Sequence, residues 1–188
     1  MRVDQGALPG VFLFTPTPAR DSRGFFTRTF DVAVATEGGL TPRSFIQDSQ
    51  SRTARGVIRG LHLRSGQGES KLVRCSWGEI FDVVLDLRQQ SPSYGRWMSV
   101  FLDDVSHRSV IVPAGCAHGF QALTDPADVC YRIDREHDPS EDVTIAWDDP
   151  DLGIEWPLPV TGMSDRDRVA PRLAAVLQEL FERHHRDK

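Results

Sequence analysis

Residues 57–133 form a series of short apolar segments separated by turn-forming residues, and this pattern restricts the fold more than any other feature of the chain. Pro92 and Gly95 mark one turn and Asp125-Pro126 marks another, with a candidate strand at 97–102 between them. Short strands with a turn about every eight to twelve residues are typical of β-sandwiches and barrels. The sequence therefore predicts an all-β fold.

The flanking segments predict peripheral elements around this core. A short helix is expected around residues 32–36, ended by Gly38-Gly39. Residues 147–150 and 154–157 resemble a strand and a loop that pack over the barrel. From Pro171 onward, apolar residues recur at helical spacing, which predicts a C-terminal helix. We expect one domain over residues 1–188, with an N-terminal β segment at 1–56, a core at 57–135, and C-terminal loops and a helix at 136–188.

Two segments carry more specific expectations. Residues 71–77 and 80–87 flank Gly78-Glu79, which predicts a hairpin. Residues 45–51 mix apolar residues with amides and hydroxyls. As a strand, this segment would offer one polar face either to a cleft or to solvent, and the sequence leaves both alternatives open.

Composition and charge exclude several classes of protein. The chain is 39% hydrophobic and 26% charged, as in ordinary globular proteins, and a net charge of −5 without a basic tract argues against a nucleic-acid partner. No run approaches the roughly 18 apolar residues of a membrane span, and the N-terminus lacks the apolar segment of a signal peptide. The cysteines contain no Cys-x-x-Cys pair and are expected to be packing residues. We therefore expect a cytoplasmic protein without a membrane or nucleic-acid partner.

The densest group of charged residues lies between Arg59 and Lys71. It also contains His62, Arg64 and Glu69, with glycines at the intervening bend, where a residue without a side chain turns most easily. Leucines alternate with these charges, so some of the polar groups are expected to face a lined cavity. A solvated basic hairpin is the alternative.

Histidines in two segments suggest a metal site. Gly60-x-His62 and Pro113-x-Gly115-x-x-His118 partly match the two half-motifs of the cupin jelly roll, in which histidines and a glutamate bind a metal. With Glu69, the two histidines supply at most three ligands, because Arg64 replaces the second histidine of the metal-binding His-x-His pattern. Arg64 and Lys71 would also repel a divalent cation. Metal binding is therefore the second hypothesis, and we expect no metal.

Without a metal, the same side chains suit proton transfer next to a carbonyl group. A neutral histidine such as His62 can remove a carbon-bound proton if an ammonium such as Lys71 stabilises the enolate. A carboxylate such as Asp167 would hold the imidazole in its basic tautomer, and a phenol such as Tyr131 could return a proton to the opposite face. That pairing would invert the carbon. Alternatively, Asp167 could cap a helix and Tyr131 could pack in the core.

A long series of short segments carries a specific resemblance. The segments are 21–26, 58–62, 71–75, 78–83, 86–88, 91–95, 113–120, 147–150, 154–157 and 164–167. In this order they resemble the deoxythymidine-diphosphate-4-dehydrorhamnose 3,5-epimerases, which are metal-free cupin-fold enzymes of nucleotide-sugar metabolism. The resemblance covers about residues 8–171. It implies an all-β, cupin-type jelly roll with short peripheral helices and a C-terminal helix.

The resemblance also implies a role for each candidate residue. His62 would be the base, paired with Asp167, while Lys71 would stabilise the enolate and Tyr131 would be the opposing acid. No cofactor would be needed. The substrate, a dTDP-linked sugar, would be bound by Arg23, Phe26, Gln47, Arg59, His118 and Arg166.

The family forms homodimers in which the N-terminal strand crosses to the neighbouring subunit. Arg23 and Phe26 would therefore complete the partner's nucleotide pocket. Arg59 would bind the diphosphate together with Arg23, in keeping with the fit of arginine to phosphate oxygens.

Three departures from the family pattern bear on specificity. Arg28 stands where the family usually has glutamate, beside the nucleotide site. Leu63-Arg64 replace the aromatic or glutamine that usually follows the motif histidine, and His137 lies in the turn where the family often has a second tyrosine. These changes affect the region that would choose the nucleotide and the carbons to be inverted.

The function predicted from the sequence is inversion of carbon 3, carbon 5 or both in dTDP-4-dehydro-6-deoxy-D-glucose, which leads to dTDP-4-dehydro-L-rhamnose through an enolate. One alternative is a mono-epimerase or ketoisomerase that acts on a related nucleotide sugar of a capsule or specialised-metabolite pathway. A more distant alternative is a metal-dependent cupin or a sugar-nucleotide binding module without catalysis.

Overall fold

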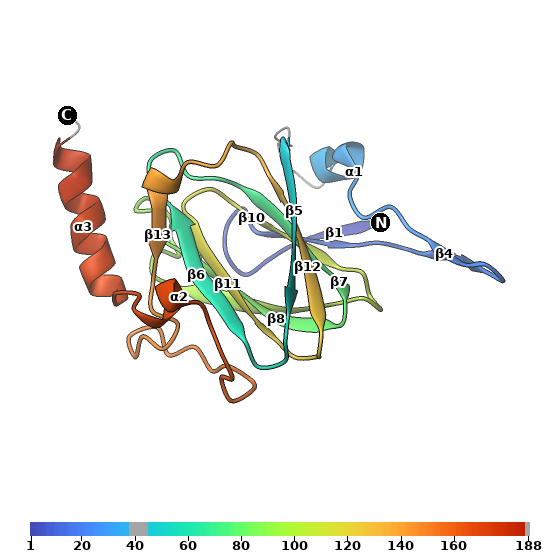
Figure 1. Ribbon diagram of the computed structural model, residues 1–188. Helices are drawn as coiled ribbons and strands as arrows, with labels where there is room; N and C mark the ends of the chain where they lie inside the picture. The colour runs from blue at the N-terminus through green and yellow to red at the C-terminus, as the bar shows by residue number, and fades with distance from the viewer. Residues whose placement is uncertain (38–44, 187–188) are drawn as a thin grey trace.

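Two antiparallel sheets face each other in the computed structural model, which describes residues 1–37 and 45–186 (Figure 1). The strands are β1 (Arg2–Gln5), β2 (Phe12–Thr15), β3 (Ala19–Asp21), β4 (Gly24–Phe26), β5 (Gln47–Thr53), β6 (Ile58–Arg64), β7 (Lys71–Trp77), β8 (Glu79–Asp86), β9 (Trp97–Asp103), β10 (Ser109–Val112), β11 (Cys116–Ala122), β12 (Ala127–Ile133) and β13 (Asp142–Thr144). The helices are α1 (Val32–Glu37), α2 (Asp165–Arg168) and α3 (Leu173–Arg186), with a short 3-10 helix at Pro139–Glu141.

The order of the strands is that of a jelly roll, as the sequence predicts. One sheet has six strands in the order β1-β2-β10-β7-β12-β5, and the other has five in the order β13-β6-β11-β8-β9. Strands β3 and β4 form a separate hairpin that extends away from both sheets (Figure 1). The expected helix at 32–36 is present as α1, and its predicted end at Gly38-Gly39 lies outside the described residues.

The main core fills the space between the two sheets. Val73 and Val129 point inward from the six-stranded sheet, and Ile80, Val84 and Phe120 point inward from the five-stranded sheet; all of them are buried. Each such side chain contributes about 1.5–3 kcal/mol through the removal of apolar surface from water. Polar residues on the same inner faces lie where this core ends, which leaves a lined space between the sheets.

The outer face of the five-stranded sheet is covered by the C-terminal part of the chain. Leu61, Phe81 and Leu85 of this sheet pack against Ile145 and α3. The apolar side of α3 consists of Leu173, Val176, Leu177 and Leu180, so the predicted C-terminal helix is present and packs as an amphipathic helix. No helix in the described part of the chain is long and apolar enough to cross a membrane.

The strand expected at residues 147–150 is absent from that position. The structure has its peripheral strand earlier, at β13, which pairs with β6. Residues 147–157 form a loop instead, because Trp156 anchors the segment by packing on Phe81 at 5.9 Å between ring centroids and by donating its indole N–H to the Trp147 carbonyl at 2.9 Å. Pro150 has no N–H to give to a strand ladder.

The hairpin predicted around Gly78 is also wrong. Strand β7 belongs to the six-stranded sheet and pairs with β10 and β12, whereas β8 belongs to the five-stranded sheet and pairs with β11 and β9. Gly78 has a φ of +76°, and the chain passes there from one sheet to the other. A glycine between two apolar strands signals a sharp change of direction, and it does not specify whether the strands pair.

The cysteines pack inside the molecule, as expected. Cys75 and Cys116 are buried and Cys130 is half-buried, and all three are free thiols. Burial raises the pKa of both Cys75 and Cys116 to about 12. These two thiols are therefore unreactive packing groups at neutral pH.

Strands β6 and β11 approach each other unusually closely at two glycines. A Cβ placed on Gly60 would lie 2.6 Å from the Cα of Gly119, and Gly60 has a φ of +124°, which side chains disfavour. The register of the two strands shifts between His118 and Phe120, and His118 lies directly opposite His62. The glycine contact thus helps to set the register that brings both histidines to the same inner face.

We expect Gly60→Ala to lower the free energy of unfolding measured by urea denaturation. A strained backbone costs about 1–3 kcal/mol, and the clash with Gly119 adds about 1–3 kcal/mol of overpacking. Gly95→Ala is a matched control, because Gly95 also has a positive φ, +77°, and a Cβ added there would meet nothing within 4 Å. Equal losses in both variants would show that the contact between the two strands contributes nothing.

Candidate active site

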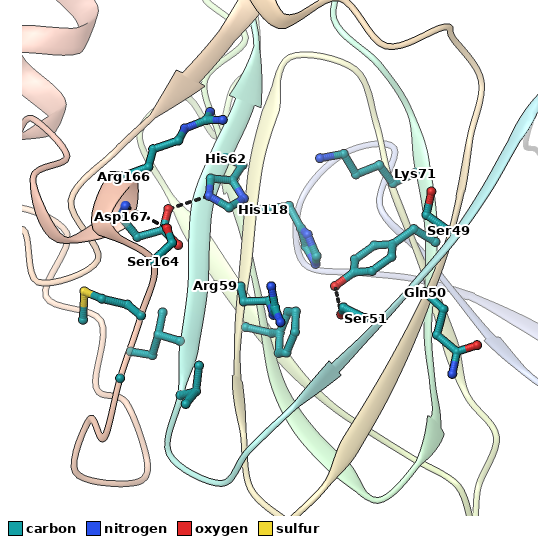
Figure 2. Close-up of a pocket in the computed structure, with 16 residues that line it drawn as sticks. Ser49, Gln50, Ser51, Arg59, His62, Lys71, His118, Ser164, Arg166 and Asp167 are labelled. Atoms are coloured by element: carbon teal, nitrogen blue, oxygen red, sulfur yellow. Dashed lines mark hydrogen bonds and ion pairs between the residues drawn. The ribbon is translucent and has the colours of Figure 1, made fainter.

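A cavity of about 770 Å³ opens between the two sheets, within the size range of small-molecule sites (Figure 2). Strands β5, β7 and β12 form one wall and β6 and β11 form the other, while the segment around α2 closes the side. The residues that line it are Ser49, Gln50, Ser51, Val57, Ile58, Arg59, His62, Lys71, His118, Phe120, Tyr131, Gly162, Met163, Ser164, Arg166 and Asp167.

His62 and Asp167 are paired on the β6 side of the cavity (Figure 2). Nε2 of His62 lies 2.7 Å from Oδ1 of Asp167, and the Asp167 side chain is 2% exposed whereas that of His62 is 37% exposed. Ser164 caps α2 by accepting a hydrogen bond from the Asp167 N–H at 3.1 Å, so Asp167 is not itself the cap. This cap holds the carboxylate against the imidazole.

The charge of Asp167 is maintained by its hydrogen bonds. Burial alone would raise its pKa, but the bonds from His62 and from the Gly60 N–H outweigh burial and lower the pKa below its ordinary value. The carboxylate is therefore ionised at neutral pH and can only accept hydrogen bonds. Nε2 of His62 therefore carries a proton, and in the neutral imidazole Nδ1 is the nitrogen free to accept one.

Tyr131 lies on the opposite wall, on β12. Its hydroxyl is 3.0 Å from Oγ of Ser51 on β5. Burial raises the pKa of Tyr131 well above its ordinary value, so the phenol keeps its proton at neutral pH. The structure thus brings an imidazole held by a carboxylate and a protonated phenol to the same cavity from two different sheets.

Two further pairs involve buried charges. Nε2 of His118 lies 2.7 Å from Oδ2 of Asp82, which is fully buried on β8, and burial raises the pKa of Asp82. On β7, Nζ of Lys71 lies 3.0 Å from Oε1 of Glu69. The three ligands of the metal hypothesis therefore have separate partners, and no group of three or more His, Cys, Asp or Glu residues in the described chain is arranged to hold a metal ion.

Arg59 and Arg166 both line the cavity. Nε of Arg59 donates to Oγ1 of Thr53 at 3.0 Å, and a nitrogen of Arg166 donates to Asp142 at 2.8 Å. Gln47 lies outside the lining, and its Nε2 donates to Oγ of Ser49, which does line the cavity.

Arg23 and Phe26 lie far from the cavity of their own chain. Both belong to the turn and second strand of the β3–β4 hairpin, which points away from the sheets (Figure 1). The Arg23 guanidinium is paired only with Asp21 among the ion pairs of the described residues, and Phe26 is 77% exposed. A large apolar side chain in such a position is typical of an interface.

Sequence reasoning missed several residues of the site. Ser51 and Ser49 were signalled only by the polar pattern of residues 45–51, of which the structure places Ser49, Gln50 and Ser51 at the cavity. Asp82 carried a clearer signal, because it interrupts the apolar residues between Ile80 and Leu85 in β8, and a buried charge needs a partner. Met163 had no such signal.

Comparisons with known proteins agree with this geometry. The matching family model is described as dTDP-4-dehydrorhamnose 3,5-epimerase and covers residues 5–175. An enzyme of that name from Methanothermobacter thermautotrophicus is 44% identical over 165 residues, which cover 86% of this chain and 89% of the relative. A dTDP-4-dehydrorhamnose 3-epimerase from Streptomyces niveus is 39% identical over 175 residues, which cover 93% of this chain and 84% of that relative.

A solved structure is also similar. It is a dTDP-6-deoxy-D-glucose-3,5-epimerase from Legionella pneumophila in complex with dTDP-4-keto-L-rhamnose; it is 36% identical, has a TM-score of 0.89, and covers 95% of this chain and 96% of its own. The family model and these identities extend over most of the chain. The chain therefore belongs to the dTDP-4-dehydrorhamnose 3,5-epimerase family of isomerases, as its sequence predicts.

Proposed function

We propose that this protein inverts carbons 3 and 5 of dTDP-4-dehydro-6-deoxy-D-glucose to give dTDP-4-dehydro-L-rhamnose. One observation carries the proposal: the base His62, with its partner Asp167, and the acid Tyr131 belong to opposite walls of one cavity. A sugar ring held between these walls has a proton acceptor on one face and a proton donor on the other. Removal and return of a proton on different faces inverts a carbon.

The mechanism uses only proton transfers. The carbonyl at carbon 4 acidifies the protons on carbons 3 and 5, and Nδ1 of His62 takes one of them. The charge that develops on the carbonyl oxygen is stabilised by the ammonium of Lys71. Tyr131 then gives its proton to the other face of the same carbon, and the hydroxyl of Ser51 stabilises the phenolate that forms. The substrate and product have the same oxidation state, so no redox partner is required.

A mono-epimerase is the second candidate function, and a specific contact favours it. Arg64 and His137, two of the departures from the family pattern, touch each other beside Lys71. The 39% identical relative from Streptomyces niveus is a 3-epimerase. Arg64 pairs with Glu69, which in turn pairs with Lys71. A change in this group would alter the position or charge of Lys71 and so favour inversion of one carbon over the other.

The exposed hairpin supports a homodimer with exchanged N-terminal strands. Arg23 and Phe26 cannot serve the cavity of their own chain from the end of β3–β4, whereas a two-fold partner could receive them. Arg23 would then contribute a cation to the diphosphate of the substrate, and Phe26 would contribute an apolar surface to its nucleobase. The three free thiols fit a reducing compartment, so we place the protein in the cytoplasm.

The stereochemistry of the product tests the proposal. Incubation of the purified protein with dTDP-4-keto-6-deoxyglucose, followed by proton NMR of the product, should show inversion at both carbons. Inversion at carbon 3 alone or carbon 5 alone would favour the second candidate function. A sugar recovered unchanged would contradict both.

His62→Ala and Tyr131→Phe should fail at different steps. Loss of the base should lower solvent-hydrogen exchange by about 10²–10⁴-fold, as is typical of a general base. Tyr131→Phe should retain more exchange than inversion, because proton removal precedes proton return. Proton NMR measures exchange and inversion in the same sample and so shows which step each variant has lost. Equal loss of both in Tyr131→Phe would contradict the role of Tyr131 as the acid.

Stability should depend on pH through Asp167. Its pKa is lower in the folded protein than in the unfolded chain, so the ionised carboxylate stabilises the fold above the ordinary aspartate value of about 3.9, and this contribution is lost as the pH falls through the folded-state value. Wild type should therefore exceed Asp167→Asn in stability at pH 7 and lose that advantage in strong acid. Asp165→Asn, at an exposed position of α2, should have the same free energy of unfolding in urea as wild type at both pH values.

Complementation between two inactive variants tests the exchanged dimer. A heterodimer of a His62→Ala chain and an Arg23→Ala chain contains one intact site, because the intact His62 and the intact Arg23 meet in the same cavity. Statistical re-assortment of equal amounts should restore about a quarter of wild-type turnover if the dimer is two-fold symmetric. A mixture that stays as inactive as its components would contradict strand exchange.

A further inference from the structure

A compact group of buried charges lies next to the cavity and surrounds Lys71. Oε1 of Glu69 is 3.0 Å from Nζ of Lys71, and Oε2 of Glu69 is 3.0 Å from Nε of Arg64. The side chains of Arg64 and Glu69 are 7% and 6% exposed, and that of Lys71 is 14% exposed. A smaller cavity of about 160 Å³ among these groups shares His62, Lys71 and Arg166 with the main cavity. Changes in this group therefore act on the reacting end of the site.

Arg64 is held in place by the loop that follows β12. One of its terminal nitrogens donates to the carbonyl of Asp138 at 2.8 Å, and the other contacts Nδ1 of His137. Its Nε faces Glu69 as an ion pair without the alignment of a hydrogen bond. The pairing with Glu69 is thus mainly one of charge, and the loop fixes where that charge sits.

The balance of charge in this group depends on Arg64. Three cations (Arg64, Lys71 and Arg166) are paired with two carboxylates (Glu69 and Asp142), which leaves 3 − 2 = 1 positive charge beside the cavity. Without Arg64, the two remaining cations would be cancelled by the two carboxylates. Arg64, Glu69 and Lys71 are largely removed from water, so their charges are weakly screened, whereas Arg166 is 47% exposed and its charge is screened more.

We propose that Arg64 and Glu69 are positioning residues for Lys71. Glu69 holds the ammonium in place, and Arg64 neutralises Glu69 so that the carboxylate does not cancel the positive charge that Lys71 presents to the cavity. The inference rests on the proposed function, in which Lys71 stabilises the enolate. It gives two departures from the family pattern, Arg64 and His137, a shared role.

The test compares Arg64→Gln with the double variant Arg64→Gln/Glu69→Gln. The single variant leaves the charge of Glu69 next to Lys71, so its kcat should fall by about tenfold, less than the 10²–10³-fold that follows loss of a direct donor to an oxyanion. KM should stay near the wild-type value, because the enolate exists only after proton removal. The neutral double variant has the wild-type net charge again, and its kcat should recover to within about threefold of wild type, a free-energy gap below about 1 kcal/mol.

Arg135→Gln is the matched control. Arg135 lies on the same loop, where its guanidinium is 2.8 Å from Glu141 and donates to the Gly68 carbonyl at 3.0 Å; among the ion pairs of the described residues it is not paired with Glu69. Its kcat should be close to that of wild type. An equal loss in Arg135→Gln, or a double variant that is as slow as Arg64→Gln, would overturn the proposal and assign the effect to the integrity of the loop.

A second measurement separates this inference from the proposed function. If the wild type does not turn over the sugar nucleotide, the proposed function fails, and urea unfolding then decides the charge pairing. A double variant that is more stable than Arg64→Gln supports the pairing of Arg64 with Glu69, because the buried carboxylate has lost its excess charge. A double variant that is no more stable than Arg64→Gln overturns it.

Discussion

The register between β6 and β11 is the constraint on which the rest of the structure depends. Gly60 and Gly119 let the two strands approach more closely than side chains would permit, and His118 then lies opposite His62. A shift of one residue would turn these histidines toward the outer face, which the C-terminal segment covers. The same segment carries Asp167 to His62, so the part of the chain that covers the outer core also supplies the partner of the imidazole.

Placing the chemistry between two sheets explains how one small cavity can hold groups with opposed tasks. The β6 side supplies an imidazole whose partner, Asp167, stays ionised, and the β12 side supplies a phenol whose pKa is raised by burial. Neither wall could act on both faces of a sugar ring. The charged groups around Lys71 add a third component to the site, which is a net positive charge that remains although two carboxylates, Glu69 and Asp142, lie among them. Stability and function share these contacts, because a buried charge without its partner destabilises the fold.

Local pattern predicted most of the fold and only part of the site. Turn signals and apolar runs indicated the strands, and helical spacing indicated α3, since both follow from burial of one face. The partners of β7 and β8 could not be predicted in this way, because Gly78 marks a change of direction and not a pairing. His62 and Lys71 stood out as polar residues among leucines. The exposed position of Phe26 and the contact of Arg64 with His137 depend on tertiary geometry that no spacing in the sequence encodes.

Inversion between two walls is the central claim, and hydrogen exchange during turnover tests it most directly. The measurement is proton NMR of the purified wild-type protein with dTDP-4-keto-6-deoxyglucose in heavy water. The account predicts loss of the signals of the protons on both carbon 3 and carbon 5, since each proton leaves to His62 and a deuteron returns from Tyr131. Retention of both signals while the substrate is bound would contradict it.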